Sequence, residues 1–457
     1  MLKILNPATG ALISEVPEAT EAIVVERARA ARAAQPAWAA RPLAERLEVM
    51  QNFRVALAAE VESLAATLTA EVGKPIRQSR SEVNGLLGRI DFFVTEAEKT
   101  IGTEQVFVDA SMRELISHEP LGVIANISAW NYPYFVGGNV FVPALLAGNA
   151  VLYKPSEFAA LTGLHIARLL HDAGVPSSIF VPLVGGAAVG TALLAQRLDG
   201  VFFTGSYATG AKIAAAVGPK LVKLQLELGG KDPTYVANDA DPKIAAESLA
   251  DGAMYNTGQS CCSVERVYVH ESIHDAFVEA FVSTVRGFKM GSPSDETTYI
   301  GAITRAPQLD VLDAQVADAL AKGATVRTGG KRGAGPGNWY EPTVVTNVDH
   351  SMELMREESF GPVIGIQKVK DDAEAVALMN DTRYGLTAGV FTRDETRARS
   401  ILSQVNAGTL YWNCCDRVSP RLPWSGYGDS GVGLTLSTYG IQTFTRPRAW
   451  HLRQPPA

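Results

Sequence analysis

The sequence has little of what marks secreted, metal-dependent or nucleic-acid-binding proteins. Its four cysteines form two adjacent pairs, Cys261-Cys262 and Cys414-Cys415, which is no disulfide framework and fits a reducing compartment. The seven histidines show neither an HExxH run nor a Cys/His cluster at zinc spacing, so we expect no catalytic metal. The net charge of −7 is mild and arginine is scattered, which argues against nucleic acid as a partner.

Signals for export and for membrane insertion are also missing. The start, Met1 to Pro7, lacks the apolar core of a signal peptide, so we expect a cytoplasmic protein. No charged residue occurs from Leu121 to Tyr153, which is long enough to raise the question of a membrane span. Asparagines and prolines interrupt this stretch, and their polar groups would be costly in lipid. Two buried parallel strands flanking a helix explain it better.

What is present is the composition of an ordinary globular protein, and 457 residues suggest about three domains at roughly 150 residues each. The first hundred residues are predicted to be mostly helical, with one helix from Thr20 to Ala34 and one long amphipathic helix from Pro42 to Val72. Gly73 stands where a helix-ending glycine is expected. Residues 104–110 and 113–118 read as two extended segments joined by a short turn.

Strand and helix patterns alternate through the remainder of the chain. The region from about Leu121 to Gly230 holds strand candidates at 122–127, 150–153 and 200–204. A second such region runs from about Lys231 to Asn413. This alternation is the signature of an α/β fold, with parallel sheets covered by helices.

The strongest candidate for chemistry is Cys261, in the run Asn-Thr-Gly-Gln-Ser-Cys-Cys. A thiol among small and polar residues is suited to attack an electrophile. Glu227 stands earlier, next but one to a Gly-Gly pair that lets the backbone come close to a reacting centre. A nucleophile with a separate base describes covalent catalysis followed by hydrolysis.

Other short runs offer binding groups, each with a plain alternative. The turn around Ser206 joins a strand to a helix whose N-terminus suits phosphate, although it is no GxGxxG fingerprint and an ordinary turn explains it equally well. Lys154 and Glu157 suit ribose hydroxyls, or form a solvated ion pair. Asn131 suits an oxyanion, or is a polar turn residue. Glu358 offers a second ribose acceptor, or ends an acidic loop.

Taken together and in order, these runs resemble the aldehyde dehydrogenase superfamily over nearly the whole chain. The matching runs are Trp130-Asn131-Tyr132-Pro133, Lys154-Pro155-Ser156-Glu157, Phe203-Thr204-Gly205-Ser206, Leu226-Glu227-Leu228-Gly229-Gly230-Lys231, Gly258-Gln259-Ser260-Cys261, Glu358-Ser359-Phe360-Gly361-Pro362 and Pro423-Trp424-Ser425-Gly426. One such motif would be weak evidence, whereas this many in sequence is very specific.

The resemblance implies a role for each matching position. Cys261 would attack the aldehyde, Asn131 with the Cys261 backbone N–H would hold the oxyanion, and Glu227 would activate the water that hydrolyses the thioester left after hydride transfer. The implied cofactor is NAD, with NADP possible, because a carboxylate at Glu157 accepts from a free 2′-hydroxyl and repels a 2′-phosphate. The implied cofactor contacts are Lys154, Glu157, Gly186, Ser206, Glu358, Phe360 and Trp130.

The family fold implies a Rossmann-like cofactor-binding domain over residues 1–103 and 119–229 and an α/β catalytic domain over 230–440. A small β oligomerisation element would comprise 104–118 and 441–457, which implies a homodimer or homotetramer. The sequence departs from the family where Leu434-Thr435 occupy the place of a common Arg-Glu pair, so proton release would take another route.

The substrate is less sharply indicated. Positions that match the family's entry tunnel are Tyr132, Phe135, Tyr255, Cys262, Trp424 and, in a nearby loop, Arg417 and Arg421. The aromatic members favour an aromatic or aliphatic aldehyde. The arginines favour a semialdehyde such as succinate semialdehyde, because arginine grips a carboxylate with two parallel hydrogen bonds. A CoA-acylating enzyme, a thiol esterase and a protein without catalysis are the remaining alternatives, and Glu227 together with the cofactor runs argues against them.

Overall fold

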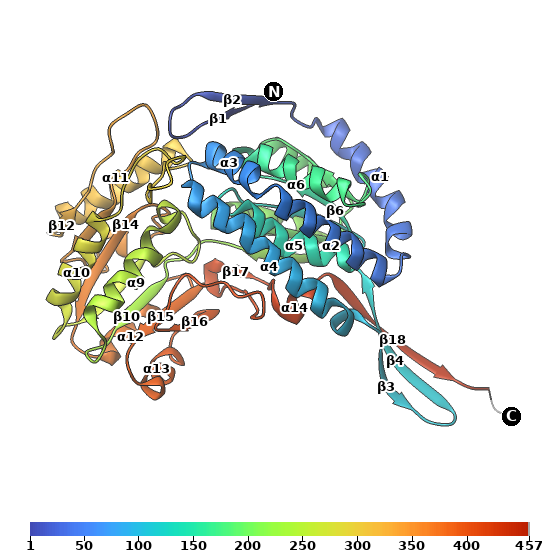
Figure 1. Ribbon diagram of the computed structural model, residues 1–457. Helices are drawn as coiled ribbons and strands as arrows, with labels where there is room; N and C mark the ends of the chain where they lie inside the picture. Colours follow the sequence, from blue (N-terminus) through green and yellow to red (C-terminus); the bar gives the residue numbers. More distant parts are fainter. Residues whose placement is uncertain (456–457) are drawn as a thin grey trace.

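The computed structural model describes residues 1–455, which form two α/β lobes and a projecting β-ribbon (Figure 1). The α/β fold that the sequence predicts is confirmed. Within residues 1–455 no helix has the length and apolar character needed to cross a membrane. The charge-free stretch from Leu121 to Tyr153 is instead a buried strand, a helix and a second buried strand, as expected.

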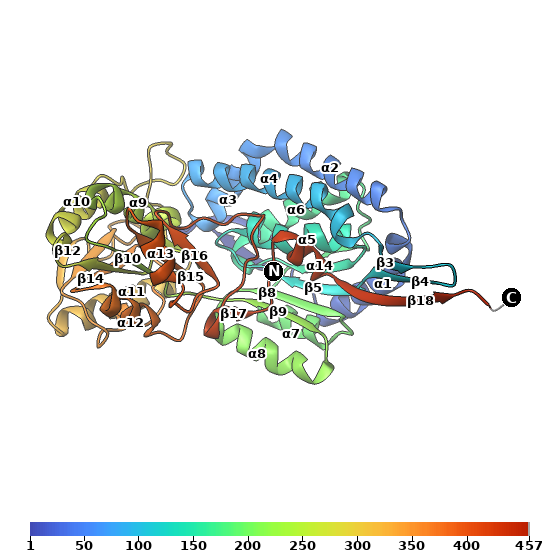
Figure 2. The same ribbon diagram turned by 90° about the horizontal axis from the view of Figure 1, so that it is seen from below.

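The first lobe is built on a six-stranded sheet with the order β17-β9-β8-β5-β6-β7, parallel except for β17. Helices α5 and α6 cover one face, backed by α2 and α4, while α7 and α8 lie on the other face (Figure 2). The strands are β5 (Val123–Ile127), β6 (Ala150–Lys154), β7 (Phe180–Pro182), β8 (Gly200–Thr204), β9 (Lys223–Glu227) and β17 (Gly431–Val432). The helices are α1 (Glu21–Ala39), α2 (Leu43–Ala59), α3 (Val61–Val72), α4 (Ile76–Ile101), α5 (Pro133–Leu146), α6 (Ala160–Asp172), α7 (Ala187–Ala195), α8 (Tyr207–Val217) and α14 (Ser437–Gln442).

The N-terminal helices agree with the sequence in part. Thr20 caps α1 by accepting from the Ile23 N–H at 3.3 Å, and Gly73 ends α3 with a left-handed φ of 77°. The single long helix expected from Pro42 to Val72 is wrong, because the backbone leaves the helical region at Glu60 (φ −114°, ψ 13°). The Glu60 carboxylate pairs with Arg168 of α6 at 2.5 Å, so a contact from another helix accompanies the break.

The second lobe carries a seven-stranded sheet with the order β12-β13-β14-β11-β10-β15-β16, in which only the edge strand β12 is antiparallel to its neighbour. Its strands are β10 (Pro233–Val236), β11 (Arg266–His270), β12 (Thr325–Thr328), β13 (Thr343–Thr346), β14 (Val363–Val369), β15 (Thr387–Phe391) and β16 (Thr409–Trp412). Its helices are α9 (Pro242–Met254), α10 (His274–Arg286), α11 (Ala306–Ala321), α12 (Asp372–Asn380) and α13 (Glu395–Leu402). Helices α9 and α10 share a core on one face, and α11, α12 and α13 share one on the other.

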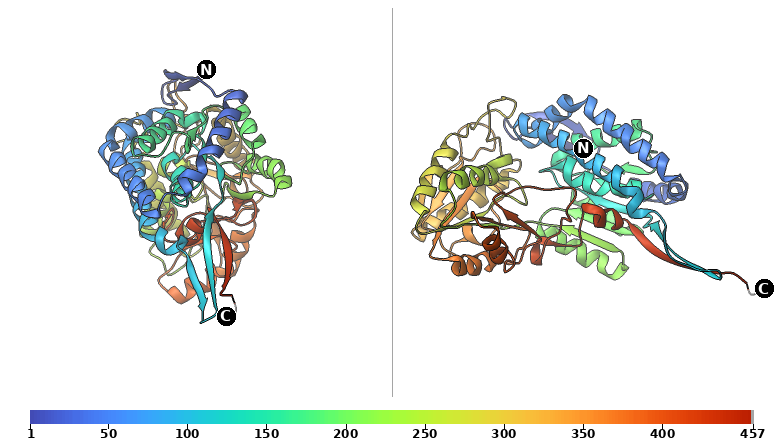
Figure 3. Two further views of the ribbon diagram at one scale, coloured as in Figure 1. Left: turned by 90° about the vertical axis from the view of Figure 1, so that its right-hand side faces the viewer. Right: turned by 60° about the horizontal axis from the view of Figure 1, so that its bottom comes forward.

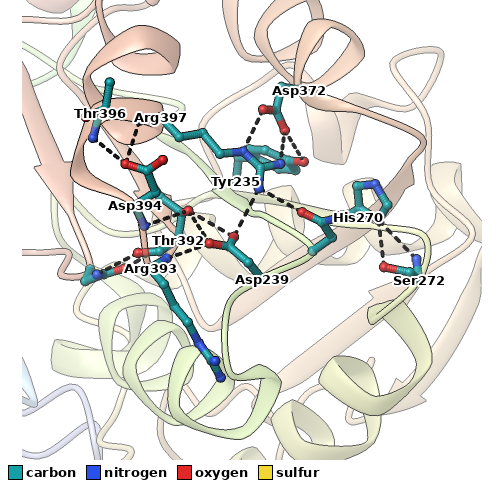
Figure 4. A network of polar contacts seen from close by, with 12 residues as sticks. Tyr235, Asp239, His270, Ser272, Asp372, Thr392, Arg393, Asp394, Thr396 and Arg397 are labelled. Carbon is teal, nitrogen blue, oxygen red and sulfur yellow. Dashed lines mark hydrogen bonds and ion pairs between the residues drawn. The ribbon is translucent and has the colours of Figure 1, made fainter.

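A polar network closes the carboxyl ends of this second sheet (Figure 4). Arg397 of α13 pairs with Asp372 at 2.6 Å and with Asp239 at 3.1 Å, and Thr392 donates to Asp239 at 2.8 Å. The carboxyl edge of an open parallel sheet is a common place for a ligand. Here it is occupied by the protein's own charges, and the opposite, amino edge of the sheet faces the first lobe.

Two further sheets lie outside the lobes. A hairpin of β1 (Leu2–Leu5) and β2 (Leu12–Val16) precedes α1. The ribbon that projects from the first lobe is β3 (Glu104–Val108), β4 (Met112–Pro120) and β18 (Thr445–Arg453), paired antiparallel in the order β18-β4-β3 (Figure 3). The ribbon thus pairs residues 104–118 with β18, and the sequence analysis assigned both to one oligomerisation element.

The end of the chain departs from the expected domain limits. Residues 230–440 were expected to form one catalytic domain, yet β17 pairs with β9 of the first lobe and α14 packs against α4. Backbone hydrogen bonds account for this return, since Gly431 stands opposite Glu227 in the register. The segment after β16 therefore crosses from the second lobe to the first before it reaches the ribbon.

Candidate active site

The candidate residues meet where the two sheets face each other. In the first lobe they follow the carboxyl ends of strands, as Asn131 follows β5 and Ser206 follows β8, and Glu227 is the last residue of β9. In the second lobe they precede the amino ends of strands, as Cys261 precedes β11 and Glu358 precedes β14. Two sheets that oppose unlike edges thus place the nucleophile, base and cofactor candidates of both lobes in the region between the sheets.

The turn that carries Cys261 is conformationally strained and held from several sides. Asn256, Thr257 and Gly258 have successive positive φ values of 53°, 57° and 71°, which is costly for a β-branched threonine. The Gln78 side chain of α4 accepts from the Asn256 N–H at 2.9 Å. The Thr257 hydroxyl accepts from the Gly301 N–H at 2.9 Å. These contacts hold a half-buried Cys261 in place.

Asn131 lies beside this turn. Its side-chain amide donates to the Gln259 carbonyl at 3.2 Å, and its own backbone carbonyl accepts from Asn256 at 3.2 Å. The same carbonyl accepts from Lys74 Nζ at 2.7 Å, and Lys74 is fully buried in an ion pair with Glu82. The sequence did not single out Lys74 or Glu82. Lys74 precedes α4 and Glu82 lies within it, and no spacing rule predicts an ion pair between two such positions.

Glu227 is buried next to an aromatic donor. Its Oε2 accepts from the Trp424 indole N–H at 2.6 Å, while its Oε1 is buried with no partner. Burial raises the pKa of Glu227 to about 8, and the Trp424 hydrogen bond opposes that rise. A carboxyl that titrates near neutrality and has one free oxygen is suited to take a proton from water. Trp424, which the sequence analysis places at the substrate tunnel, thus also bonds the candidate base.

Thr435 fixes the position of Trp424. The two residues exchange backbone hydrogen bonds of 2.8 and 2.9 Å, in an antiparallel bridge. Thr435 is one of the two residues that replace the family's Arg-Glu pair, and here its backbone supports the tryptophan that bonds Glu227.

A second carboxyl with a raised pKa, Asp416, contacts the residues on either side of Cys261. It accepts from the Cys262 thiol at 3.0 Å and from the Ser260 hydroxyl at 3.4 Å, and it adopts a left-handed φ of 47°. Burial raises the pKa of Asp416 to about 7. The hydrogen bond with Cys261, then burial and the nearby Asp416, raise the pKa of the Cys262 thiol, which favours its neutral form.

The loop with Glu358 and Phe360 is positioned by a buried network. Lys231 Nζ donates to Glu265 at 2.6 Å and to the Ser359 hydroxyl at 3.1 Å, and Glu265 also accepts the Phe360 N–H at 3.1 Å. Glu358 in turn accepts the Gly230 N–H at 3.0 Å. Burial, then the nearby Glu265, raises the pKa of Glu358 to about 8.

The other predicted cofactor residues come from both lobes. Trp130 meets Phe360 edge to face, with ring centroids 5.6 Å apart. Lys154 Nζ is buried 3.7 Å from Glu157, whose side chain is 38% exposed, so this pair is not the fully solvated one considered as an alternative. Gly186 caps α7 and a Cβ there would meet open space, while Ser206 caps α8 without bonding its first N–H groups.

A cavity of about 650 Å³ opens onto Cys261. All the substrate candidates line it: Tyr132, Phe135, Tyr255, Cys262, Arg417, Arg421 and Trp424. The loop arginines are exposed, while a third arginine, Arg89 of α4, is 5% exposed and lines the same cavity. Sequence reasoning missed Arg89. The signal was present, since Ser81, Gly85 and Gly88 place small residues on the same helical face.

The described residues 1–455 hold no cluster of three or more histidine, cysteine or acidic side chains arranged for a metal. A thiol that lines a cavity, a buried carboxyl and an amide beside the thiol define an enzyme site suited to covalent chemistry at a carbonyl.

The comparisons with known proteins identify the family. The model of the aldehyde dehydrogenase family matches residues 1–450. The chain is 36% identical to the 3,6-anhydro-alpha-L-galactose dehydrogenase of Streptomyces coelicolor, covering 99% of this chain and 93% of that one. It is also 36% identical to the succinate semialdehyde dehydrogenase [NAD(P)+] Sad of Escherichia coli K12, covering 96% and 95%. A solved structure of an E. coli NADP dependent enzyme superposes with a TM-score of 0.96 at 30% identity, covering 99% and 95%. The chain belongs to the aldehyde dehydrogenase family.

Proposed function

We propose that this protein oxidises an aldehyde to the carboxylic acid with NAD(P)+, through a thioester on Cys261 that Glu227-activated water hydrolyses. The observation that carries the proposal is the Glu227 carboxyl. It is buried, has one partnerless oxygen and a pKa of about 8, and is bonded to a tryptophan that also lines the cavity containing Cys261.

The proposed steps use residues of this chain. The Cys261 thiolate adds to the aldehyde carbon, and the oxyanion of the thiohemiacetal is held by the Asn131 amide and the Cys261 N–H. Bound NAD(P)+ would supply the acceptor for the hydride that leaves this carbon. Glu227 then takes a proton from water, the water oxygen attacks the thioester carbon, and the C–S bond breaks to release the acid and the Cys261 thiolate. Glu227 finally passes its proton to solvent.

The residues present fit a dinucleotide. The first N–H groups of α8 are not capped by the Ser206 side chain, so they suit a pyrophosphate. Lys154 and Glu157 lie at the carboxyl end of β6, and the Glu18 carboxylate accepts the Gly186 N–H at 3.4 Å. Two carboxylates around Lys154 favour a free 2′-hydroxyl, so we propose NAD as the preferred cofactor, with NADP as the second.

The presence of Glu227 supports water, and not CoA, as the acyl acceptor. The proposed assembly is a homodimer or homotetramer through the ribbon, and the proposed domain limits follow the two sheets, with 431–442 assigned to the cofactor lobe. On the edge strand β3 Val106, Phe107 and Val108 are exposed, and an unpaired apolar edge is suited to pair with another chain.

The test is NADH or NADPH formation with short aliphatic, aromatic and carboxylate-bearing aldehydes. Cys261→Ala should abolish it, while Cys414→Ala, a half-buried cysteine of the second pair, should keep it. Activity that survives in Cys261→Ala would refute the proposal. Reduced cofactor formed only when CoA is added would replace hydrolysis by acyl transfer to CoA.

A further inference from the structure

The cavity beside Cys261 contains a buried cation that has no ion-pair partner among residues 1–455. Arg89 is 5% exposed, its Nε has no hydrogen-bond partner, and no ion pair to it occurs among the described residues. A buried charge without a partner costs several kcal/mol, and proteins rarely keep one for packing alone. Burial lowers the pKa of Arg89 to about 10, so the guanidinium stays protonated at neutral pH.

The face of the guanidinium is occupied and its edge is free. The Arg89 Cζ lies 3.6 Å from the Phe135 ring centroid, and Phe135 stacks on Tyr132 with centroids 5.8 Å apart. On the far side of this stack Lys74 Nζ lies 3.8 Å from the Tyr132 ring. The Phe135 contact holds the guanidinium in place, and its N–H groups make no hydrogen bond to the protein within residues 1–455. A guanidinium with free N–H groups can bind a carboxylate with two parallel hydrogen bonds.

The carboxylates that line the same cavity are engaged elsewhere. Glu82 pairs with Lys74 and also accepts the Tyr134 N–H at 2.9 Å. Asp416 accepts from Cys262 at 3.0 Å, and Asp251 accepts from the Tyr299 hydroxyl. None of them bonds Arg89 within residues 1–455. Glu82 attracts Arg89 at longer range, but its hydrogen bonds go to Lys74 and Tyr134, so a carboxylate in direct contact with Arg89 would come from a ligand.

A second unsatisfied group lies in the same cavity. Asn139 of α5 is 7% exposed, and its Oδ1 is buried with no partner. The oxygen and nitrogen of an asparagine amide exchange places on a half-turn, so this side chain can present an N–H donor. Gly88, which precedes Arg89, would place a Cβ in open space, so α4 leaves room beside the guanidinium.

We propose that Arg89, with Asn139 of the same cavity, binds an anionic group at the end of the substrate remote from the carbonyl, and so selects aldehydes that carry a distal carboxylate. This inference rests on the proposed function and names its substrate class. The exposed Arg417 and Arg421 lie at the same cavity and belong to its entrance, where they attract the anion rather than grip it.

The experiment compares succinate semialdehyde with butanal, which has the same carbon count and no charge. Arg89→Gln should lower kcat/KM for succinate semialdehyde by about 100-fold, as expected when one partner of a buried charge pair is removed, and change it for butanal less than about threefold. For succinate semialdehyde, the kcat/KM of Arg89→Lys should fall between that of the wild type and that of Arg89→Gln. Arg77→Gln removes the same charge from an exposed position of α4 and should leave both values unchanged. Equal losses for both aldehydes in Arg89→Gln would overturn the proposal.

A binding measurement separates this inference from the proposed function. Calorimetry on Cys261→Ala protein should detect succinate but not butyrate, and Arg89→Gln should abolish the difference. If wild-type protein oxidises butanal as well as succinate semialdehyde and binds the two acids alike, the Arg89 proposal fails and the aldehyde dehydrogenase function stands. If no aldehyde is oxidised, the proposed function fails, and selective succinate binding would still support the Arg89 site.

Discussion

Replacing Trp424 with phenylalanine should slow thioester hydrolysis and make it dependent on higher pH. The indole N–H donates to Glu227 Oε2 at 2.6 Å, and phenylalanine keeps an aromatic ring but offers no donor. That hydrogen bond stabilises the ionised carboxylate against the burial that raises its pKa. Its loss therefore favours the neutral acid, which cannot take a proton from water.

The size of the effect follows from the hydrogen bond. A hydrogen bond to a charged group contributes about 1.5–3 kcal/mol, which corresponds to roughly 1–2 pH units in the inflection of the rate. With a pKa of about 8, about one Glu227 in ten is ionised at pH 7. In Trp424→Phe the ionised fraction falls about 10- to 100-fold, and hydrolysis at pH 7 should fall with it.

The assay is rapid mixing of enzyme, cofactor and aldehyde at a series of pH values. Slow hydrolysis shows as a burst of about one reduced cofactor per active site, followed by a slow steady state, because hydride transfer precedes the step that needs Glu227. The control is Trp412→Phe, since the Trp412 indole donates to the Thr392 carbonyl at 3.0 Å on the second lobe. Trp412→Phe should show the same dependence of the hydrolysis rate on pH as the wild type.

An inflection that stays at the wild-type pH, or moves to lower pH, would refute this reasoning. Such a result would mean that water enters the space left by the indole and solvates Glu227 better than Trp424 did. An unchanged rate at pH 7 without a burst would show that Glu227 does not limit turnover.

Two further predictions concern Glu227 and Glu157. Burial raises the folded pKa of Glu227 from a usual 4.5 to about 8, so the stability from its bound proton is fully present below pH 4.5 and is lost as pH rises through 8. Between pH 5 and 9, Glu227→Gln should therefore lose less free energy of unfolding than the wild type, as measured by denaturant titration. Parallel curves of stability against pH for the two proteins would contradict this. Glu157→Gln removes a half-exposed charge near Lys154 and should raise the NADP-to-NAD ratio of kcat/KM by roughly two- to fivefold, and a ratio that falls would place the 2′-hydroxyl elsewhere.

The sequence predicts the fold class and the candidate nucleophile and base because both depend on short local patterns. The strand at 200–204 matches β8 residue for residue, since a run this short that is rich in valine and phenylalanine and begins and ends beside glycine is typical of a buried strand. Cys261 and Glu227 were found because each lies in a distinctive short run. The family resemblance then followed from the order in which these short runs occur along the chain.

The contacts that support these residues escaped prediction because they join distant parts of the chain. Trp424 and Glu227 are 197 residues apart, and no spacing rule links an indole to a carboxyl. The Glu60 break was missed for the same reason, because its partner Arg168 is 108 residues away. Arg89 was missed although small residues share its helical face, because only the folded structure shows that it lines a cavity without an ion-pair partner among residues 1–455.

The return of the chain end to the first lobe sets the order in which the enzyme is completed during synthesis. A nascent chain that ends at β16 already holds Cys261, Asn131 and Glu227, but it lacks the strand that pairs beside Glu227 and the indole that bonds it. Domains fold from the N-terminus as they leave the ribosome. Such a chain also lacks Asp416, which accepts hydrogen bonds from both neighbours of Cys261. The surroundings of Cys261 and of Glu227 are therefore completed only by the last part of the chain to be made.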